Sequence, residues 1–301
     1  MSVTTPRPPL RLLALAAVAP MVWATTYIVT EKCLPDDRPL FSALLRALPM
    51  GLVLLAWRRT LPPPGWWGRA VVLGVLNIGA FFPLIYLSAY GLPGGLAATV
   101  QALLPLAVMA WAFVLVRERA TAARLIGGVV GLAGVALLVL GTTVGVTALG
   151  LFGAVASVLC TSVGSVLVKR WTPPVDNLTL VSWQLVVGGL LLLPVALLFE
   201  GAPPAIDLPA ALGYLWIGVV GTGVAYWCWF SAIQQMPAGS VALISLLNPV
   251  TATLIGVAFA AEPFGLPQAV GMALVLGGVG YGQFGGRRAA AEKREEIHAA
   301  A

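Results

Sequence analysis

The chain has 301 residues, of which 59% are hydrophobic and only 9% are charged, and its formal net charge is +6. A soluble domain carries about 25% charged residues, so this composition excludes an ordinary soluble protein. Nucleic-acid binding requires basic residues gathered into a patch on a folded surface. The basic residues here are instead spread between apolar segments, which excludes nucleic acid as a partner.

Apolar segments of about 20 residues recur along the whole chain, and a helix of about 20 residues crosses ~30 Å of hydrocarbon. The sequence therefore predicts an all-α integral membrane protein with ten transmembrane helices. The short connections between them are rich in proline and glycine and leave no room for a soluble domain. In chain order, the predicted spans cover residues 10–30, 40–57, 69–90, 95–116, 122–141, 147–169, 179–199, 210–233, 239–260 and 266–285.

Basic residues are distributed unevenly between the two sides of the membrane. If the amino terminus lies inside, the outer segments hold only Lys32 and Arg38. Cytoplasmic loops carry an excess of Lys and Arg, so we expect a multi-pass protein of the inner (plasma) membrane with both termini cytoplasmic. The inner segments hold Arg7, Arg11, Arg58, Arg59, Arg69, Arg117, Arg119, Arg124, Lys169, Arg170, Arg287, Arg288, Lys293 and Arg294.

One pattern occurs twice, 144 residues apart. Each half contains five predicted spans, an odd number, so two halves in tandem have opposite orientations in the membrane. The sequence therefore predicts two inverted five-helix repeats, 10–141 and 147–285, followed by a cytoplasmic tail, 286–301. The offset relates Pro105 to Pro249, Glu118 to Glu262, Pro93 to Pro237, Gly95 to Gly239, Gly127 to Gly271 and Gly134 to Gly278.

Residues in both halves of the chain also carry a family resemblance. They are Trp23, Lys32, Arg46, the Pro…Glu…Gly run over 102–138, Trp183, Gln184 and the matching run over 246–279. With them the chain resembles the drug/metabolite transporter superfamily, specifically its EamA-type members, from residue 10 to about 284. The resemblance implies two EamA domains and the export of amino acids or related small metabolites. Residues 24–27 depart from the family's pattern after the first tryptophan, which leaves the substrate open.

The repeated prolines are predicted to break two helices near mid-membrane. Pro105 leaves the carbonyl of Gln101 without a donor, and Pro249 does the same to Ser245. Each proline stands 13 residues, about 20 Å, before the glutamate that ends its span. Unpaired backbone groups are not tolerated against lipid, so we expect these positions to face protein or a water-filled cavity. The alternative is a packing kink whose carbonyl is bonded locally.

Other neutral polar and aromatic residues lie at similar depth in the predicted spans. Together they suit a small polar or amphipathic organic solute better than a bare ion. For each of them the alternative is structural, because Ser and Thr bond their own helix and Trp and Tyr form interfacial belts. These candidates are Trp23, Thr26, Tyr27, Asn77, Tyr86, Thr161, Ser162, Trp183, Gln184, Tyr226, Trp227 and Asn248.

Charged residues within the predicted spans are rare. Arg46 is the only one clearly inside a span, and it is a candidate for substrate or gate contact. Its alternatives are an interfacial anchor or an ion pair with Glu31 or Asp37. For Glu118 and Glu262 we favour helix termination with loop capping over a pair of symmetric gate latches. No Asp, Glu or His stands at the middle of a predicted span, which argues against a buried proton relay.

The leading function is a secondary transporter whose partners are a small-molecule solute and the lipid bilayer. A membrane enzyme is the first alternative, although we find no cluster of catalytic or metal-ligating residues and expect no cofactor or metal. A non-transporting structural or sensory membrane protein is the second. Glycine stripes over 127–134 and 271–280 allow close helix approach, either inside the fold or at a homodimer face.

Overall fold

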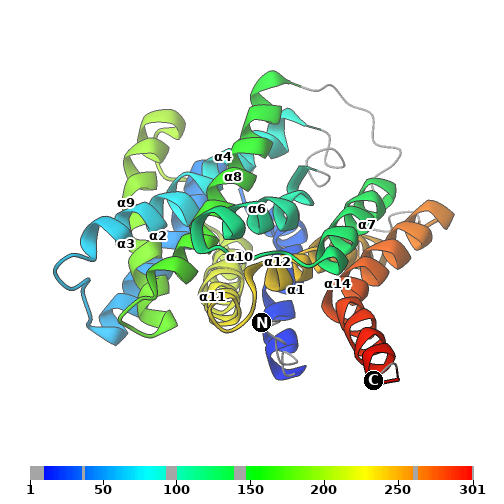
Figure 1. Cartoon of the computed structure of the whole chain (residues 1–301). Coiled ribbons are helices and arrows are strands. Elements are labelled where there is room, and N and C mark those ends of the chain that lie inside the picture. The colour runs from blue at the N-terminus through cyan, green and yellow to red at the C-terminus, as the bar shows by residue number, and fades with distance from the viewer. Residues whose placement is uncertain (1–9, 36–37, 93–99, 139–146, 260–263, 300–301) are drawn as a thin grey trace.

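A computed structural model describes residues 10–35, 38–92, 100–138, 147–259 and 264–299, and within them helix is the only regular structure (Figure 1). Helices satisfy their own backbone hydrogen bonds, which hydrocarbon requires. The α-helices are α1 (Leu10–Cys33), α2 (Pro39–Arg58), α3 (Trp67–Gly74), α4 (Phe81–Gly91), α6 (Leu104–Val116), α7 (Ala122–Leu138), α8 (Ala148–Trp171), α9 (Asn177–Glu200), α10 (Leu208–Leu215), α11 (Ala225–Gln235), α12 (Ala238–Ile244), α13 (Leu247–Phe259) and α14 (Leu266–Ala299). Two π-helical segments, η1 (Val75–Gly79) and η2 (Trp216–Val224), join α3 to α4 and α10 to α11.

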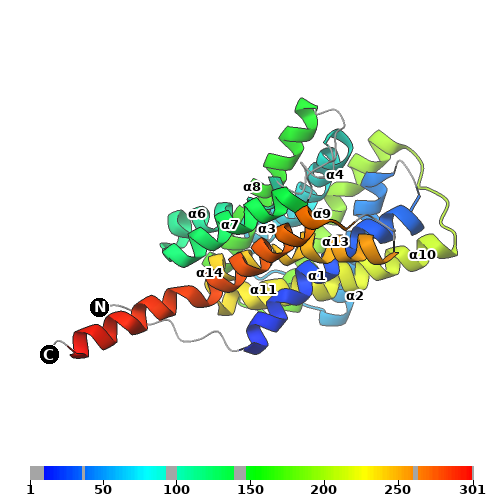
Figure 2. The same ribbon diagram turned by 90° about the vertical axis from the view of Figure 1, so that its right-hand side faces the viewer.

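Seven of the described helical units are long and apolar enough to cross a membrane. The shorter apolar helices α6 and α7 and the start of α14 lie where the remaining spans are predicted. This confirms the prediction of an all-α integral membrane protein. The predicted tail continues α14 as a helix to Ala299, and Figure 2 shows that part, in red, extending away from the other helices.

α7 and α14 lie side by side in both views (Figures 1 and 2), and their glycines meet reciprocally. A Cβ atom on Gly134 would lie 2.6 Å from the carbonyl oxygen of Gly271, and one on Gly278 would lie 2.6 Å from that of Gly127. Residue numbers rise along one helix as they fall along the other, so the pair is antiparallel. The 144-residue offset exchanges the two contacts, as an inverted repeat requires. These four glycines therefore pack inside the fold.

α2 and α9, the second predicted span of each half, form another antiparallel pair. A Cβ atom on Gly51 would lie 2.8 Å from the Cβ of Leu185, and one on Gly189 would lie 2.7 Å from the Cβ of Leu48. Equivalent helices of the two halves thus cross each other at two separate places. Both crossings depend on glycine, because a side chain there would meet the partner helix.

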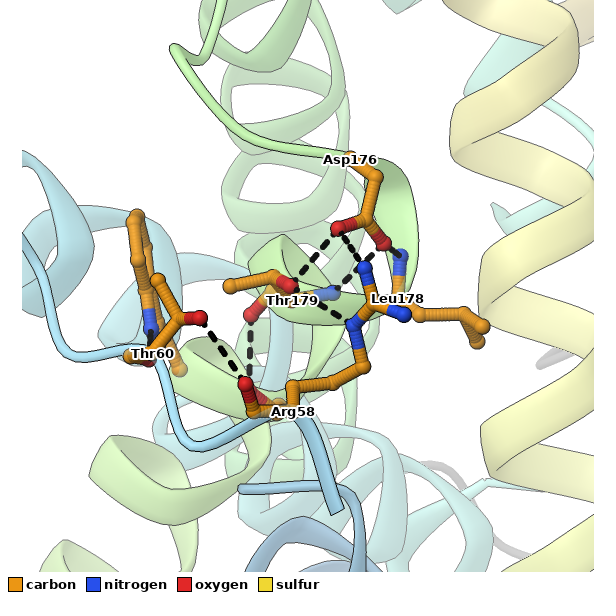
Figure 3. Close-up of polar contacts among 7 residues, drawn as sticks. Arg58, Thr60, Asp176, Leu178 and Thr179 are labelled. Atoms are coloured by element: carbon orange, nitrogen blue, oxygen red, sulfur yellow. Dashed lines mark hydrogen bonds and ion pairs between the residues drawn. The ribbon is translucent and has the colours of Figure 1, made fainter. Parts of the chain in front are cut away.

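Polar contacts close both ends of the α2–α9 pair. At one end, the carboxylate of Glu200 accepts from the backbone N–H groups of residues 40–41, at 2.6 and 2.9 Å. At the other end, which we call the inner end because it is predicted to be cytoplasmic, Arg58 pairs with Asp176 (Figure 3). Asp176 also caps α9, accepting from the N–H of Thr179 at 3.2 Å. The two halves are therefore joined at both ends of this pair.

Candidate functional site

The two repeated prolines do mark helix breaks. α6 begins at Leu104 after a turn at 102–103, and α12 and α13 are separated by a turn at 245–246. The carbonyl of Ser245 nevertheless accepts from the N–H of Asn248 at 3.0 Å. The expectation that Pro249 leaves this carbonyl bare is therefore wrong, because the turn tightens to i→i+3 bonds and supplies another donor.

The side chains beside these breaks bond to neighbouring helices. Gln101 donates to the hydroxyl of Ser157 on α8 at 2.6 Å, and Asn248 donates to the carbonyl of Pro20 on α1 at 3.2 Å. Ser245 donates back to the carbonyl of Ala242 in its own helix at 2.6 Å. No hydrogen bond joins Gln101 to Ser245 in the described part of the chain. The expectation that these two positions face a water-filled cavity stays a prediction.

The two π-helical segments are a second repeated feature, which the sequence does not predict. Residues 75–79 of η1, moved by 144, fall on 219–223, inside η2. Both segments lie at the middle of a span. In η1 the N–H of Ala80 donates to the carbonyl of Val75, five residues earlier, at 2.7 Å. Such a slip in register presents main-chain groups to other partners, and π-bulges are frequent at functional sites.

The carbonyl of Gly221 in η2 accepts two side-chain donors from the other half. The Trp23 indole Nε1 and the Arg46 Nη2 both lie 3.0 Å from it. Arg46 Nε also donates to the hydroxyl of Thr222 at 2.8 Å, and its guanidinium lies 4.8 Å from the ring centre of Phe82. These groups hold Arg46 in one orientation, and all of them are neutral.

The carbonyl of Asn77, the equivalent position in η1, accepts from the hydroxyl of Tyr226 at 3.2 Å. The amide of Asn77 donates to Gln184 at 2.7 Å, and both side chains are only 1% exposed. Gly164 on α8 provides the space for the Asn77 amide, since a Cβ atom there would overlap it. The Oδ1 atom of Asn77 has no hydrogen-bond partner within the described residues.

These contacts form one group of residues around the two π segments, which we call the mid-span cluster. Trp23 connects its parts, since its ring centre lies 5.4 Å from that of Tyr226 and 5.6 Å from that of Trp229. Arg46 follows the first residue of α2 by seven positions, about 10 Å along the helix. The cluster comprises Trp23, Arg46, Asn77, Phe82, Gln184, Gly221, Thr222, Tyr226 and Trp229.

Two predicted tryptophans lie outside this cluster. Trp183 donates to the carbonyl of Thr60 at 2.7 Å and lies near the ring of Trp66, so it anchors the connection after α2. Trp227 is 38% exposed and continues the exposed apolar positions Trp216 and Val224. Their assignment as cavity residues stays a prediction. Neither joins the mid-span cluster, because neighbouring helical residues point about 100° apart and depth alone does not choose a face.

The remaining candidates are not among the residues of the mid-span cluster. Tyr86 and Thr161 are half-buried on α4 and α8. Ser162 bonds the carbonyl of Leu159 in its own helix at 3.0 Å, as its structural alternative expects. The hydroxyl of Thr26 is buried and has no partner in the described part of the chain. The side chain of Tyr27 lies outside the described residues, as does all of Glu262.

Glu118 forms an ion pair between the two halves at the inner end. Its carboxylate lies 2.6 Å from Nζ of Lys169, which also donates to the carbonyl of Met236 at 2.8 Å. The expectation of loop capping by the Glu118 side chain is therefore wrong. α6 ends instead with Arg117 in the left-handed conformation (φ 57°) and a 3.1 Å bond from the Glu118 N–H to the carbonyl of Ala112, as is common at helix C-termini.

Paired inverted halves with polar groups at the midplane are the architecture of secondary transporters. The model of the EamA-like transporter family matches residues 10–140 and 148–281. The chain therefore belongs to the EamA-like transporter family, and the resemblance noted in the sequence is confirmed.

Named relatives cover most of the chain. Protein PecM of Dickeya dadantii is 37% identical over 269 residues, which are 89% of this chain and 90% of that protein. A protein of Salmonella typhimurium named "Probable amino-acid metabolite efflux pump" is 26% identical over 91% of this chain and 95% of its own. A solved crystal structure matches with a TM-score of 0.81 and 22% identity over 94% of this chain and 99% of that one, and supports the fold.

Proposed function

We propose that this protein is a secondary transporter that exports small organic metabolites, such as amino acids or related compounds, by alternating access. The observation that carries the proposal is the mid-span cluster. Main-chain carbonyls of two π segments, one from each inverted half, meet polar and aromatic side chains at the middle of the spans. A site between two such halves can open to either side as they rock against each other.

The class of solute and the direction of transport are proposed from the name of one relative. A relative named as an amino-acid metabolite efflux pump covers nearly the whole chain and supports small metabolites as cargo. The asymmetry of basic residues supports insertion in the inner membrane with both termini cytoplasmic. A membrane enzyme is the competing function, and it would need reactive groups converging on the same cluster.

The Glu118–Lys169 ion pair gives this proposal a candidate inner gate. It joins the end of α6 in the first half to α8 in the second, and Lys169 extends the connection to the carbonyl after α11. An inward-open state requires these elements to separate. The pair would therefore form and break once in each transport cycle.

The direct test is counterflow in proteoliposomes. Vesicles that contain the purified protein are preloaded with one unlabelled metabolite at millimolar concentration, and entry of the same labelled metabolite is followed. We expect transient accumulation of at least one solute from a panel of amino acids and organic acids, and none in protein-free vesicles. Chemical conversion of a panel member without accumulation would support the enzyme instead.

A further inference from the structure

Arg46 carries a positive charge that the described contacts do not neutralise. A guanidinium stays protonated in proteins, and a charge at this depth is expensive without a partner of opposite sign. All of its described contacts are with neutral groups. The side chain is half-buried rather than extended to the surface. The acidic partners that the sequence offers, the side chain of Glu31 and all of Asp37, lie outside the described residues. Among the described residues, Arg46 therefore has donors available for an anion and no anion to receive them.

The acidic side chains that the structure describes are all engaged elsewhere. Glu118 pairs with Lys169 and Asp176 with Arg58. Glu200 caps α2, and Asp207 caps α10 by accepting from the N–H of Ala210 at 2.8 Å. None of the four is in contact with Arg46.

The guanidinium is also held in a geometry that suits an anion. Nε and one hydrogen of Nη2 are occupied by Thr222 and Gly221, while Nη1 has no partner within the described residues. The remaining Nη1–Nη2 edge presents parallel donors, the arrangement that binds a carboxylate in a bidentate manner. Because the other contacts already fix the side chain, little further ordering is required when an anion binds.

The pseudo-symmetry of the two halves shows that Arg46 makes the hydrogen bond that a tyrosine hydroxyl makes in the other half. Tyr226 of the second half bonds the Asn77 carbonyl through its hydroxyl. The equivalent residue of the first half is Phe82, which has no hydroxyl, and Arg46 lies over its ring and donates to the equivalent carbonyl of Gly221. The hydrogen bond to the Asn77 carbonyl is therefore neutral, whereas the equivalent bond to the Gly221 carbonyl comes from a cation.

We propose that Arg46 is the specificity-determining residue of the solute site and selects organic carboxylates with a planar apolar group. The carboxylate lies on the Nη1–Nη2 edge, and the rings of Phe82, Trp23 and Tyr226 line the apolar part. This inference rests on the proposed function and deepens it, because it names the substrate class. Arg46 comes from the first half and Gly221 from the second, so the bound anion contacts the boundary between them.

The test measures binding of matched acid and amide probes to the full-length protein in phosphatidylcholine nanodiscs. The probes are phenylacetate against phenylacetamide, and indole-3-acetate against indole-3-acetamide. A charge-assisted bidentate contact predicts at least a tenfold preference for each acid. Arg46→Gln should reduce this ratio to about one, and Arg46→Lys, which keeps the charge but not the fork, should keep a small part of it. Arg59→Gln is the matched control, because Arg59 is exposed at the inner end, and its ratio should equal that of the wild type.

Equal affinities for acid and amide in the wild type, or no binding of either, would overturn the inference even if Arg46→Gln failed to fold. Loss of the acid's advantage when phosphatidylglycerol is added would assign Arg46 to a lipid phosphate instead. The outcome is separable from that of the proposed function. Counterflow without acid preference leaves the transporter and removes the role of Arg46, whereas acid preference without counterflow leaves the site and removes the transporter.

Discussion

The helix crossings and the mid-span cluster obey the two-fold relation between the halves to different degrees. At the α7–α14 crossing, Gly127 meets Gly278 and Gly134 meets Gly271, so the contacts are the same from either half. In the cluster, Tyr226 and Phe82 occupy equivalent positions and differ by one hydroxyl. The Arg46 guanidinium lies over the Phe82 ring. Symmetry is kept where helices must pack and is broken where a solute would be recognised.

The largest effect is expected at the symmetric crossing. Gly278→Ala would place a Cβ atom 2.6 Å from the carbonyl of Gly127, and such overpacking costs about 1–3 kcal/mol. The melting temperature in detergent should fall clearly. Gly277→Ala is the matched control, since nothing lies within 4 Å of that Cβ position, and it should be neutral or slightly stabilising. Equal melting temperatures for the two variants would show that α7 and α14 do not cross in this way.

The second prediction makes the cluster more symmetric. Tyr226→Phe removes the hydroxyl that donates to the Asn77 carbonyl, and a hydrogen bond of this kind contributes about 0.5–1.5 kcal/mol. We expect a lower melting temperature and reduced counterflow, with the acid preference retained because Arg46 is intact. Phe230→Leu, which alters a neighbouring buried ring on α11 without removing a hydrogen bond, controls for loss of packing. If Tyr226→Phe lost the acid preference, recognition of the anion would not reside with Arg46.

The third prediction concerns the inner ion pair. Both side chains are about one-fifth exposed, so Glu118→Gln should cost only about 1 kcal/mol or less in stability. Because the pair joins the two halves, its loss should instead shift the population toward the inward-open state. Cysteine labelling from the inner side should then increase in the variant. We expect no selective loss of pH-driven accumulation, and such a loss would indicate that Glu118 carries a coupling proton.

The smallest effect is expected at Asp176. Burial favours its neutral form, but hydrogen bonds from Thr179 and the Arg58 guanidinium outweigh burial, so the pKa of Asp176 is lowered. A lowered pKa gives stability that is present above the ordinary value of about 3.9 and is lost as pH falls through the folded-state pKa. Asp176→Asn keeps a cap and removes the charge, so its deficit of tenths of a kcal/mol at pH 7 should vanish in acid. A deficit at Asp176 that is equal at pH 7 and in strong acid would contradict the ion pair.

The sequence predicted the features that depend on composition and period. The membrane class followed from apolar length, and Pro105 and Pro249 break their helices where the 144-residue repeat indicated. The features that it did not predict depend on tertiary partners. In each π segment a carbonyl accepts from a side chain of another helix, Tyr226 in one and Arg46 in the other, and local sequence does not show such partners. Likewise, Trp183 and Gln184 are adjacent in sequence, yet one anchors a connection and the other bonds to Asn77 in the cluster.

The central claim is that the solute binds at the mid-span cluster, and protection of an engineered cysteine tests it most directly. The three native cysteines, Cys33, Cys160 and Cys228, are first replaced by serine. Trp23→Cys, Gln101→Cys or Ser245→Cys is then introduced and treated with a small water-soluble thiol reagent, with and without the solute identified by counterflow. We predict that the cysteine at 23 is labelled and that the solute protects it. Protection at 101 and 245 without protection at 23 would contradict this account and place the site between the proline-broken helices.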